Sequence, residues 1–105
     1  MSKISVVTVC YNAETSIEET MKSVISQTYN DIEYIVIDGA STDNTLGVIN
    51  RFSYCNYLRI VSEPDKGLYN AMNKATRMAQ GDYIIFLNSG DAFCAKDVSL
   101  HLAPP

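Results

Sequence analysis

The sequence predicts one α/β domain, built as a Rossmann-like open, mainly parallel sheet with flanking helices. Short β-branched runs alternate along the chain with longer segments whose apolar residues recur at helical spacing. Such alternation is typical of parallel strands joined by right-handed helical crossovers. The length of 105 residues, with 47% hydrophobic and 19% charged residues, suits a single ordinary globular domain.

The N-terminal part of the chain holds the first strand and the first helix. The run Ile4–Cys10 is β-branched and almost continuously apolar, as expected for a strand covered on both faces. A helix is expected from about Thr15 to Thr28, and Ser16 with Glu19 has the spacing of a capping box at its start. The face of this helix expected to be buried consists of Ile17, Met21, Val24, Ile25 and Thr28.

The middle of the chain holds a second strand, a short helix and a third strand. The second strand is expected over Glu33–Asp38 and is followed by a turn at residues 39–43. Asp43 is a suitable N-cap for a helix that runs to about Phe52. The third strand, expected over Tyr57–Val61, leads into residues 62–67, which are rich in turn formers.

One more helix and strand complete the alternation. Gly81 is expected to end the helix in the left-handed C′ position. The fourth strand is expected over Asp82–Leu87 and runs into the polar segment Asn88–Asp91. The side of the helix expected to be buried consists of Leu68, Ala71, Met72, Ala75, Met78 and Ala79.

Polar residues follow all four predicted strands. The carboxyl ends of parallel strands meet at one edge of a sheet, where ligands bind. Asp38 is the strongest binding candidate by position, because a carboxylate that ends a buried strand needs a partner. Structural alternatives stay open for others: Asp43 as a helix cap, Asn12 as a residue that ties down its own loop, and residues 88–91 as a plain turn. The polar residues expected at this edge are Asn12, Asp38, Asp43, Asp65, Asn88 and Asp91.

The charge and the motifs exclude several classes of ligand. The formal charge is −4 and no Lys/Arg run occurs, so no nucleic acid partner is expected. No P-loop is present and no G-x-G-x-x-G follows the first strand, whereas oxygen-rich Asp and Asn loops suit Mg²⁺ or Mn²⁺ beside a phosphorylated ligand. The three cysteines are widely spaced and no apolar run is long enough to cross a bilayer, so we expect a cytoplasmic protein without a transmembrane segment.

Four stretches of the chain resemble, in order and spacing, the family 2 glycosyltransferases, the inverting group with a GT-A fold. They are Ser5–Asn12, Ile35–Thr45, Glu63–Lys74 and Ala79–Asp91, and they span almost the whole chain. The third and fourth are most similar to the subgroup that builds bacterial surface polysaccharides such as colanic acid. The resemblance implies transfer of a sugar from a nucleoside diphosphate sugar to an acceptor hydroxyl.

The resemblance also implies roles for the matching positions. Thr8 and the loop of Tyr11 and Asn12 would line the nucleotide pocket, and Asp38 would hydrogen-bond the imide N–H of a uracil. Asp65 would close over the base and ribose. The segment Asn88–Asp91 stands where the family has its D-x-D motif, so Asp91 would hold the divalent cation, Mg²⁺ or Mn²⁺. The implied nucleotide-sugar-binding residues are Thr8, Tyr11, Asn12, Asp38, Ser41, Asp65, Lys66 and Asn88.

The chain departs from the family pattern at several positions. Asn88 and Gly90 stand where the family commonly has Asp, which leaves Asp91 as the only carboxylate of the metal motif, and Met72 replaces a usual Arg. Family members are considerably longer and carry their catalytic base in a later segment. We therefore expect residues 1–105 to be the nucleotide-sugar-binding part of a truncated domain, with the base beyond Pro105 and an exposed apolar edge that favours self-association.

The expected partners follow from the same resemblance. The donor is expected to be a UDP-sugar, with a GDP-sugar as the alternative, and the acceptor to be a saccharide or a lipid-linked saccharide. A lipid-linked acceptor would place the protein at the inner face of the membrane. Two other interpretations stay open. One is a truncated, non-catalytic remnant or a nucleotide-binding module without transferase activity; the other is a nucleotidyltransferase, whose usual Gly-rich basic loop is absent from residues 8–13.

Overall fold

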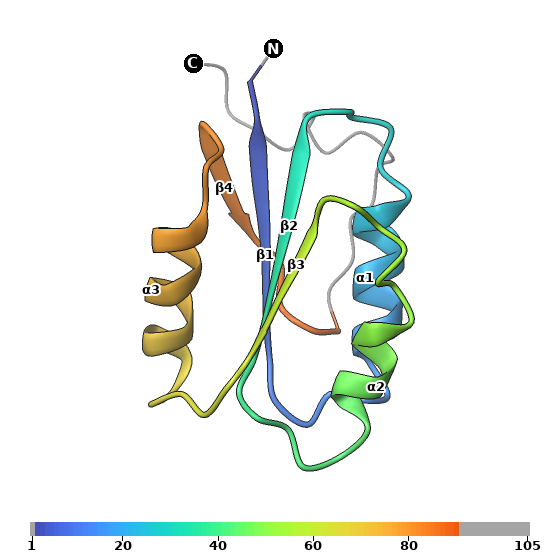
Figure 1. Cartoon of the computed structure of the whole chain (residues 1–105), viewed down its shortest axis with the longest axis vertical. Coiled ribbons are helices and arrows are strands. Elements are labelled where there is room, and N and C mark those ends of the chain that lie inside the picture. The colour runs from blue at the N-terminus through green and yellow to red at the C-terminus, as the bar shows by residue number, and fades with distance from the viewer. Residues whose placement is uncertain (1, 91–105) are drawn as a thin grey trace.

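The computed structural model describes residues 2–90 and shows a four-stranded sheet with strand order β3-β2-β1-β4 (Figure 1). Every strand pairs in parallel with its neighbours, which confirms the predicted architecture. The strands are β1 (Ile4–Cys10), β2 (Ile32–Asp38), β3 (Leu58–Ser62) and β4 (Tyr83–Phe86).

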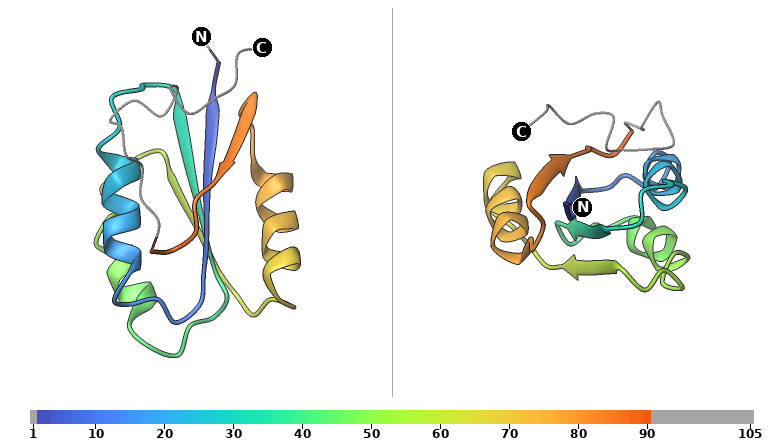
Figure 2. Two further views of the ribbon diagram at one scale, coloured as in Figure 1. Left: turned by 180° about the vertical axis from the view of Figure 1, so that it is seen from behind. Right: turned by 90° about the horizontal axis from the view of Figure 1, so that it is seen from above.

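The helices cover the two faces of the sheet unequally. Helices α1 (Ile17–Ile25) and α2 (Thr45–Asn50) lie on one face, and α3 (Leu68–Met78) lies on the other, as Figure 2 shows. The first two crossovers build the sheet outward from β1 to β3, and α3 then returns the chain to the opposite side of β1. The strand order therefore reverses beside β1, and in open α/β sheets this reversal marks the ligand crevice.

The core has two parts because the strands are covered on both faces. Side chains alternate along β1, so Ile4 and Val6 pack towards α1 and α2, while Val7 packs towards Ala71 and Ala75 of α3. The side facing α1 and α2 is the larger cluster. The small alanines let α3 lie close to the sheet.

Helices α1 and α2 are both shorter than predicted. The capping box at the start of α1 does not form, because the Ser16 hydroxyl donates to the Ala13 carbonyl (3.4 Å) and no side-chain cap is made. Helix α2 ends at Asn50 because the next N–H groups, of Arg51 and Phe52, bond carbonyls three residues back, as in a 3₁₀ turn.

Gly81 has a different role from the predicted left-handed cap. Helix α3 is followed by Ala79 in an extended conformation, and the described glycines with positive φ are Gly67 and Gly90. A Cβ on Gly81 would lie 2.5 Å from the Ser5 hydroxyl oxygen and 2.7 Å from the Ser5 backbone nitrogen. Glycine is needed here because the chain passes against β1, where the Gly81 N–H donates to that hydroxyl (2.9 Å).

The buried carboxylate of Glu33 connects the segment before β4 to the sheet. Glu33, only 5% exposed, accepts hydrogen bonds from the Ser5 hydroxyl (2.6 Å) and from the Gln80 N–H, and it lies 3.5 Å from the Arg59 guanidinium. Burial favours the protonated form, but the bonds from Ser5 and Gln80 and the charges of Lys3 and Arg59 outweigh it and lower the pKa of Glu33. The ionised carboxylate therefore holds the start of β4 to β1 and β2.

Large apolar side chains are exposed at the start of α3 and on β4. Leu68 was expected to be buried but is 56% exposed, since it lies in the first turn of α3, beyond the sheet contact made by the alanines. Ile84 and Phe86 of the edge strand β4 are 37% and 40% exposed. Within residues 2–90, no helix has the length and apolar character needed to span a bilayer.

Candidate functional site

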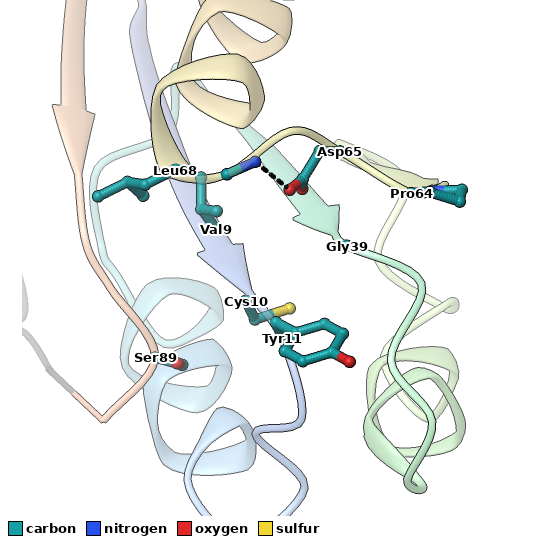
Figure 3. A pocket seen from close by; sticks show the side chains of 9 residues that line it. Val9, Cys10, Tyr11, Gly39, Pro64, Asp65, Leu68 and Ser89 are labelled. Carbon is teal, nitrogen blue, oxygen red and sulfur yellow. Dashed lines mark hydrogen bonds between the residues drawn. The ribbon is translucent and has the colours of Figure 1, made fainter.

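A cavity of about 560 Å³ lies at the carboxyl ends of the strands (Figure 3). Each of the four segments that follow a strand contributes to its wall, as expected where parallel strands end together. The lining residues are Val9, Cys10, Tyr11, Gly39, Pro64, Asp65, Gly67, Leu68 and Ser89.

Tyr11 and Asp65 approach each other across Gly39. A Cβ at position 39 would lie 3.0 Å from Asp65 Oδ2 and 3.5 Å from Tyr11 Cδ1, so both side chains border the same small volume. The Tyr11 ring is 60% exposed. The Asp65 carboxylate is oriented by the Gly67 N–H, which donates to Oδ1 (3.1 Å). The cavity thus combines an open aromatic surface with a fixed carboxylate.

Asn12 ties the loop after β1 to the loop after β2. Its amide oxygen accepts the N–H groups of Thr42 (2.8 Å) and Asp43 (3.4 Å), and its own N–H donates to the Ser41 hydroxyl (2.8 Å). The backbone of Asn12 has φ of 49°, a left-handed conformation that Asn tolerates better than most residues. These contacts support the structural alternative for Asn12, and they hold the adjacent Tyr11 at the cavity.

Asp43 acts as a cap, although Asn44 is the formal N-cap residue of α2. Its carboxylate accepts the Thr45 N–H (2.9 Å) and the Thr45 hydroxyl, and also the Glu14 N–H (3.4 Å). The bond from the Thr45 hydroxyl is the main cause that lowers the pKa of Asp43. Asp43 does not line the cavity.

Asp38 is fully buried and its partners come from within the protein. Oδ1 accepts the Ser41 hydroxyl (2.5 Å), while Oδ2 accepts the Ser41 N–H (3.2 Å) and the Ser62 hydroxyl (2.8 Å). The Cys10 thiol lies 3.8 Å from Oδ1. Burial, together with the charge of Asp38, raises the pKa of Cys10 to about 12, so the thiol stays protonated at neutral pH.

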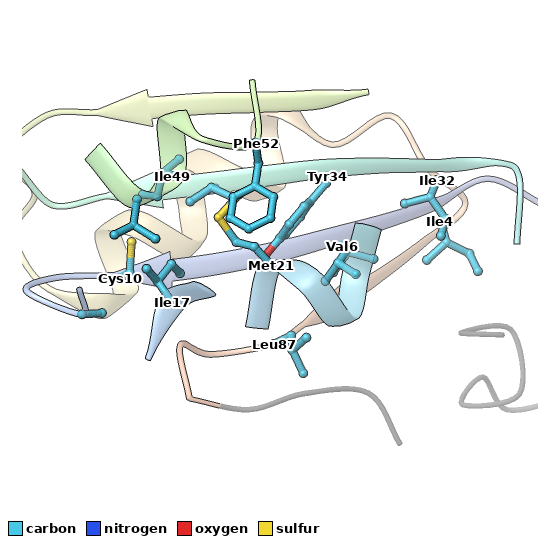
Figure 4. Packing of buried hydrophobic residues seen from close by; sticks show 14 residues of the cluster. Ile4, Val6, Cys10, Ile17, Met21, Ile32, Tyr34, Ile49, Phe52 and Leu87 are labelled. Atoms are coloured by element: carbon cyan, nitrogen blue, oxygen red, sulfur yellow. The ribbon is translucent and has the colours of Figure 1, made fainter. Parts of the chain in front are cut away.

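Thr8 does not line the cavity, which corrects the expectation for this residue. It is fully buried and its hydroxyl is 2.7 Å from the hydroxyl of Tyr34. Tyr34 lies within the cluster of apolar side chains under α1 and α2 (Figure 4). Thr8 shares its face of β1 with Val6, so the alternation of the strand directs it into this core.

The remaining implied residues lie around the cavity rather than in its wall. Lys66 is exposed and its N–H donates to the Asn70 amide oxygen (3.2 Å), while Asn88 is exposed beside the lining residue Ser89. Asp91 lies outside the described residues. Several lining residues were not among the predicted binding residues, and their main signal was their place at or just after the carboxyl end of a strand. They are Val9, Cys10, Gly39, Pro64, Gly67, Leu68 and Ser89.

The described residues hold part of the expected metal site at most. Within residues 2–90, no group of three or more His, Cys, Asp or Glu side chains lies close enough to share an ion. Ser89 brings the segment after β4 to the cavity, two residues before Asp91.

Sequence comparison connects the chain with proteins that build bacterial glycans. It is 36% identical over 99 residues to UDP-Glc:alpha-D-GlcNAc-diphosphoundecaprenol beta-1,3-glucosyltransferase WfaP of Escherichia coli, covering 94% of this chain and 39% of that protein. It is 38% identical over 90 residues to the putative teichuronic acid biosynthesis glycosyltransferase TuaG of Bacillus subtilis, covering 84% of this chain and 36% of that protein. The chain thus spans well under half the length of these relatives.

Structural comparison finds similar proteins that are bound to nucleotide sugars. The mannosyltransferase PcManGT from Pyrobaculum calidifontis, in complex with GDP-Man and Mn²⁺, matches with a TM-score of 0.86 and 28% identity over 93% of this chain and 30% of that one. TarS from S. aureus in complex with UDP-GlcNAc matches with a TM-score of 0.80 and 29% identity over 86% of this chain and 27% of that one. The family model of glycosyl transferase family 2 matches residues 5–104, and the chain therefore belongs to this family.

Proposed function

We propose that this chain supplies the nucleotide-sugar site of a glycosyltransferase that acts in the synthesis of a cell-surface polysaccharide. The cavity carries the proposal: it lies where the strand order reverses and it places an open tyrosine ring beside a carboxylate. This arrangement suits a nucleoside, with a flat ring to stack and a donor edge to bind. The family and the transferase names of the relatives support the same assignment.

The chemistry of the donor requires a cation in addition to these residues. A divalent ion bound through Asp91 would act as a Lewis acid and stabilise the negative charge of the leaving diphosphate. The residues of this chain would hold the nucleoside and bring the segment of Ser89 to the diphosphate. We assign the base that deprotonates the acceptor to a segment beyond Pro105, so residues 1–105 are proposed as the donor-binding part of a larger unit.

The comparisons also guide the choice of partners. A UDP-sugar is the proposed donor because WfaP is named for UDP-Glc and TarS is bound to UDP-GlcNAc, whereas PcManGT, bound to GDP-Man, supports a GDP-sugar as the alternative. The acceptor is proposed to be a lipid-linked saccharide, as the name of WfaP specifies for that enzyme. Such an acceptor would place the protein at the cytoplasmic face of a membrane.

Self-association is proposed to occur through β4. This edge strand exposes Ile84 and Phe86 on one face, and among residues 2–90 no strand pairs with its outer side. Sedimentation of the chain at increasing concentration measures this association, and the double change of Ile84→Lys and Phe86→Lys should keep the protein monomeric.

Titration calorimetry with UDP, with and without Mn²⁺, tests the donor site. The proposal expects binding that depends on the metal and is lost in Asp91→Ala. Glu18→Ala is the matched control, because this glutamate lies on the exposed side of α1, where it pairs with Lys22. Absence of any nucleotide binding would favour the non-catalytic remnant, and tight binding of nucleoside triphosphates would favour a nucleotidyltransferase.

A further inference from the structure

The carboxylate of Asp38 is buried and already bonded by partners within the protein. It is fully buried, and both oxygens accept hydrogen bonds from Ser41 and Ser62. A base N–H could reach it only after a serine had moved away, which would leave a buried polar group without a partner. Ser41 in turn accepts the Asn12 N–H, so Asp38 fixes the loop that carries Tyr11. These contacts make Asp38 a positioning residue.

The carboxylate of Asp65, in contrast to the buried carboxylate of Asp38, borders open space. It lines the cavity, and its Oδ1 is held by the Gly67 N–H. Its Oδ2 lies towards Gly39, and within residues 2–90 no hydrogen bond to this oxygen is formed. A fixed, partly exposed carboxylate oxygen at a cavity wall is an acceptor available to a ligand.

Gly39 keeps open the space between this acceptor and the Tyr11 ring. Any side chain at position 39 would enter that space, since even a Cβ would lie 3.0 Å from Asp65 Oδ2 and 3.5 Å from the ring. Gly39, Asp65 and Tyr11 therefore enclose a narrow space with an aromatic ring on one side and a hydrogen-bond acceptor on the other. A planar heterocycle with an N–H on its edge suits this space.

We propose that Asp65, rather than Asp38, accepts a ring N–H of the nucleotide base, N3–H in uracil or N1–H in guanine, and selects bases that carry such a group. The inference rests on the proposed function, because it assumes that the cavity binds a nucleotide. Uracil has an N–H at N3 and guanine has one at N1, whereas cytosine and adenine have a bare nitrogen acceptor at the corresponding position. A carboxylate facing that acceptor gains no hydrogen bond and repels its lone pair, so CDP and ADP are discriminated against.

Binding of UDP, GDP, CDP and ADP to the 105-residue chain tests this assignment by calorimetry. The unmodified chain should prefer UDP or GDP over CDP and ADP. Asp65→Ala should weaken the preferred nucleotide by about 10- to 100-fold, the loss expected for a hydrogen bond to a charged group, and should remove the preference. Glu63→Gln is the matched control in the same segment, since Glu63 is exposed and pairs with Lys74.

Asp38→Asn distinguishes positioning from base recognition. It should lower the affinity for all four nucleotides by a similar factor and leave their ranking unchanged, with thermal unfolding measured alongside. The inference is overturned if Asp65→Ala keeps the ranking, or if Asp38→Asn abolishes it in a protein that unfolds at the usual temperature. In either case the proposed function stands, because the unmodified chain still binds. If the unmodified chain binds none of the four, the proposed function fails and the inference fails with it.

Discussion

Replacing Gly81 by alanine should strongly destabilise the fold, because the chain crosses β1 at this point without room for a side chain. The added Cβ would lie 2.5 Å from Ser5 Oγ, 2.7 Å from Ser5 N and 2.9 Å from Lys3 O, whereas ordinary contacts are 3.4–4 Å. Two of the three are backbone atoms, one in β1 and one in the residue before it, so the start of β4 must shift by roughly 1 Å. Overpacking of this kind costs about 1–3 kcal/mol. The Gly81–Ser5 hydrogen bond of 2.9 Å would also be lost, at about 0.5–1.5 kcal/mol.

Urea unfolding followed by far-UV circular dichroism measures the effect, and Gly47→Ala provides a matched control with the opposite sign. Gly47 lies inside α2, and the three atoms nearest to its new Cβ, from 2.3 Å, all belong to the side chain of Asn44, which is exposed, makes no cap bond and can turn away. This substitution should stabilise the chain by up to about 1 kcal/mol through helix propensity. We expect Gly81→Ala to lower the free energy of unfolding by about 2–4 kcal/mol. A loss below about 0.5 kcal/mol would refute the close-approach reasoning, since that is within the range of neutral surface changes.

Two further predictions concern the cavity and the buried carboxylate. Gly39→Ala should leave stability almost unchanged, because its neighbours are side-chain atoms of Asp65 and Tyr11 that can move, but should weaken nucleotide binding at least about 10-fold by filling the space between them; equal affinity by calorimetry would contradict this. Glu33→Gln should lower the free energy of unfolding at pH 7 by about 1–3 kcal/mol. The fold lowers the pKa of Glu33 from its ordinary value of 4.5. The ionised carboxylate therefore stabilises the fold above pH 4.5, and this stabilisation is lost as the pH falls below that value. The free energies of unfolding of the two proteins should therefore converge in acid. A constant difference down to pH 3 would exclude this cause.

The elements were predictable because each depends on local patterns. All four strands and three helices lie where the alternation of β-branched runs and helical spacing places them. The errors fall at element ends, where a few hydrogen bonds decide. Ser16 bonds the Ala13 carbonyl instead of forming a capping box, and Gly81 serves a contact with β1 that is 76 residues away in sequence.

The candidate site was predictable only in outline. Parallel strands bring their carboxyl ends together, so the segments carrying Tyr11, Asp65 and Ser89 had to meet at one edge. The sequence did not show in which direction each of these side chains would point. Thr8 and Asp38 carry polar groups that a sequence reader assigns to the ligand, yet both are buried against partners from neighbouring strands.

The sequence by itself determined the fold class, the family and the edge of the sheet that holds the site, because these follow from periodicity and from motifs that are contiguous in the chain. Only the tertiary structure decided which carboxylate is available to a ligand. In the sequence both carboxylates stand at the carboxyl end of a predicted strand, Asp38 as its last residue and Asp65 in the segment that follows, and Asp38 is the stronger candidate by position. Their difference arises from residues brought close by folding: Ser41 and Ser62 donate hydrogen bonds to both oxygens of the buried Asp38, whereas the absence of a side chain on Gly39 leaves Asp65 facing an open space.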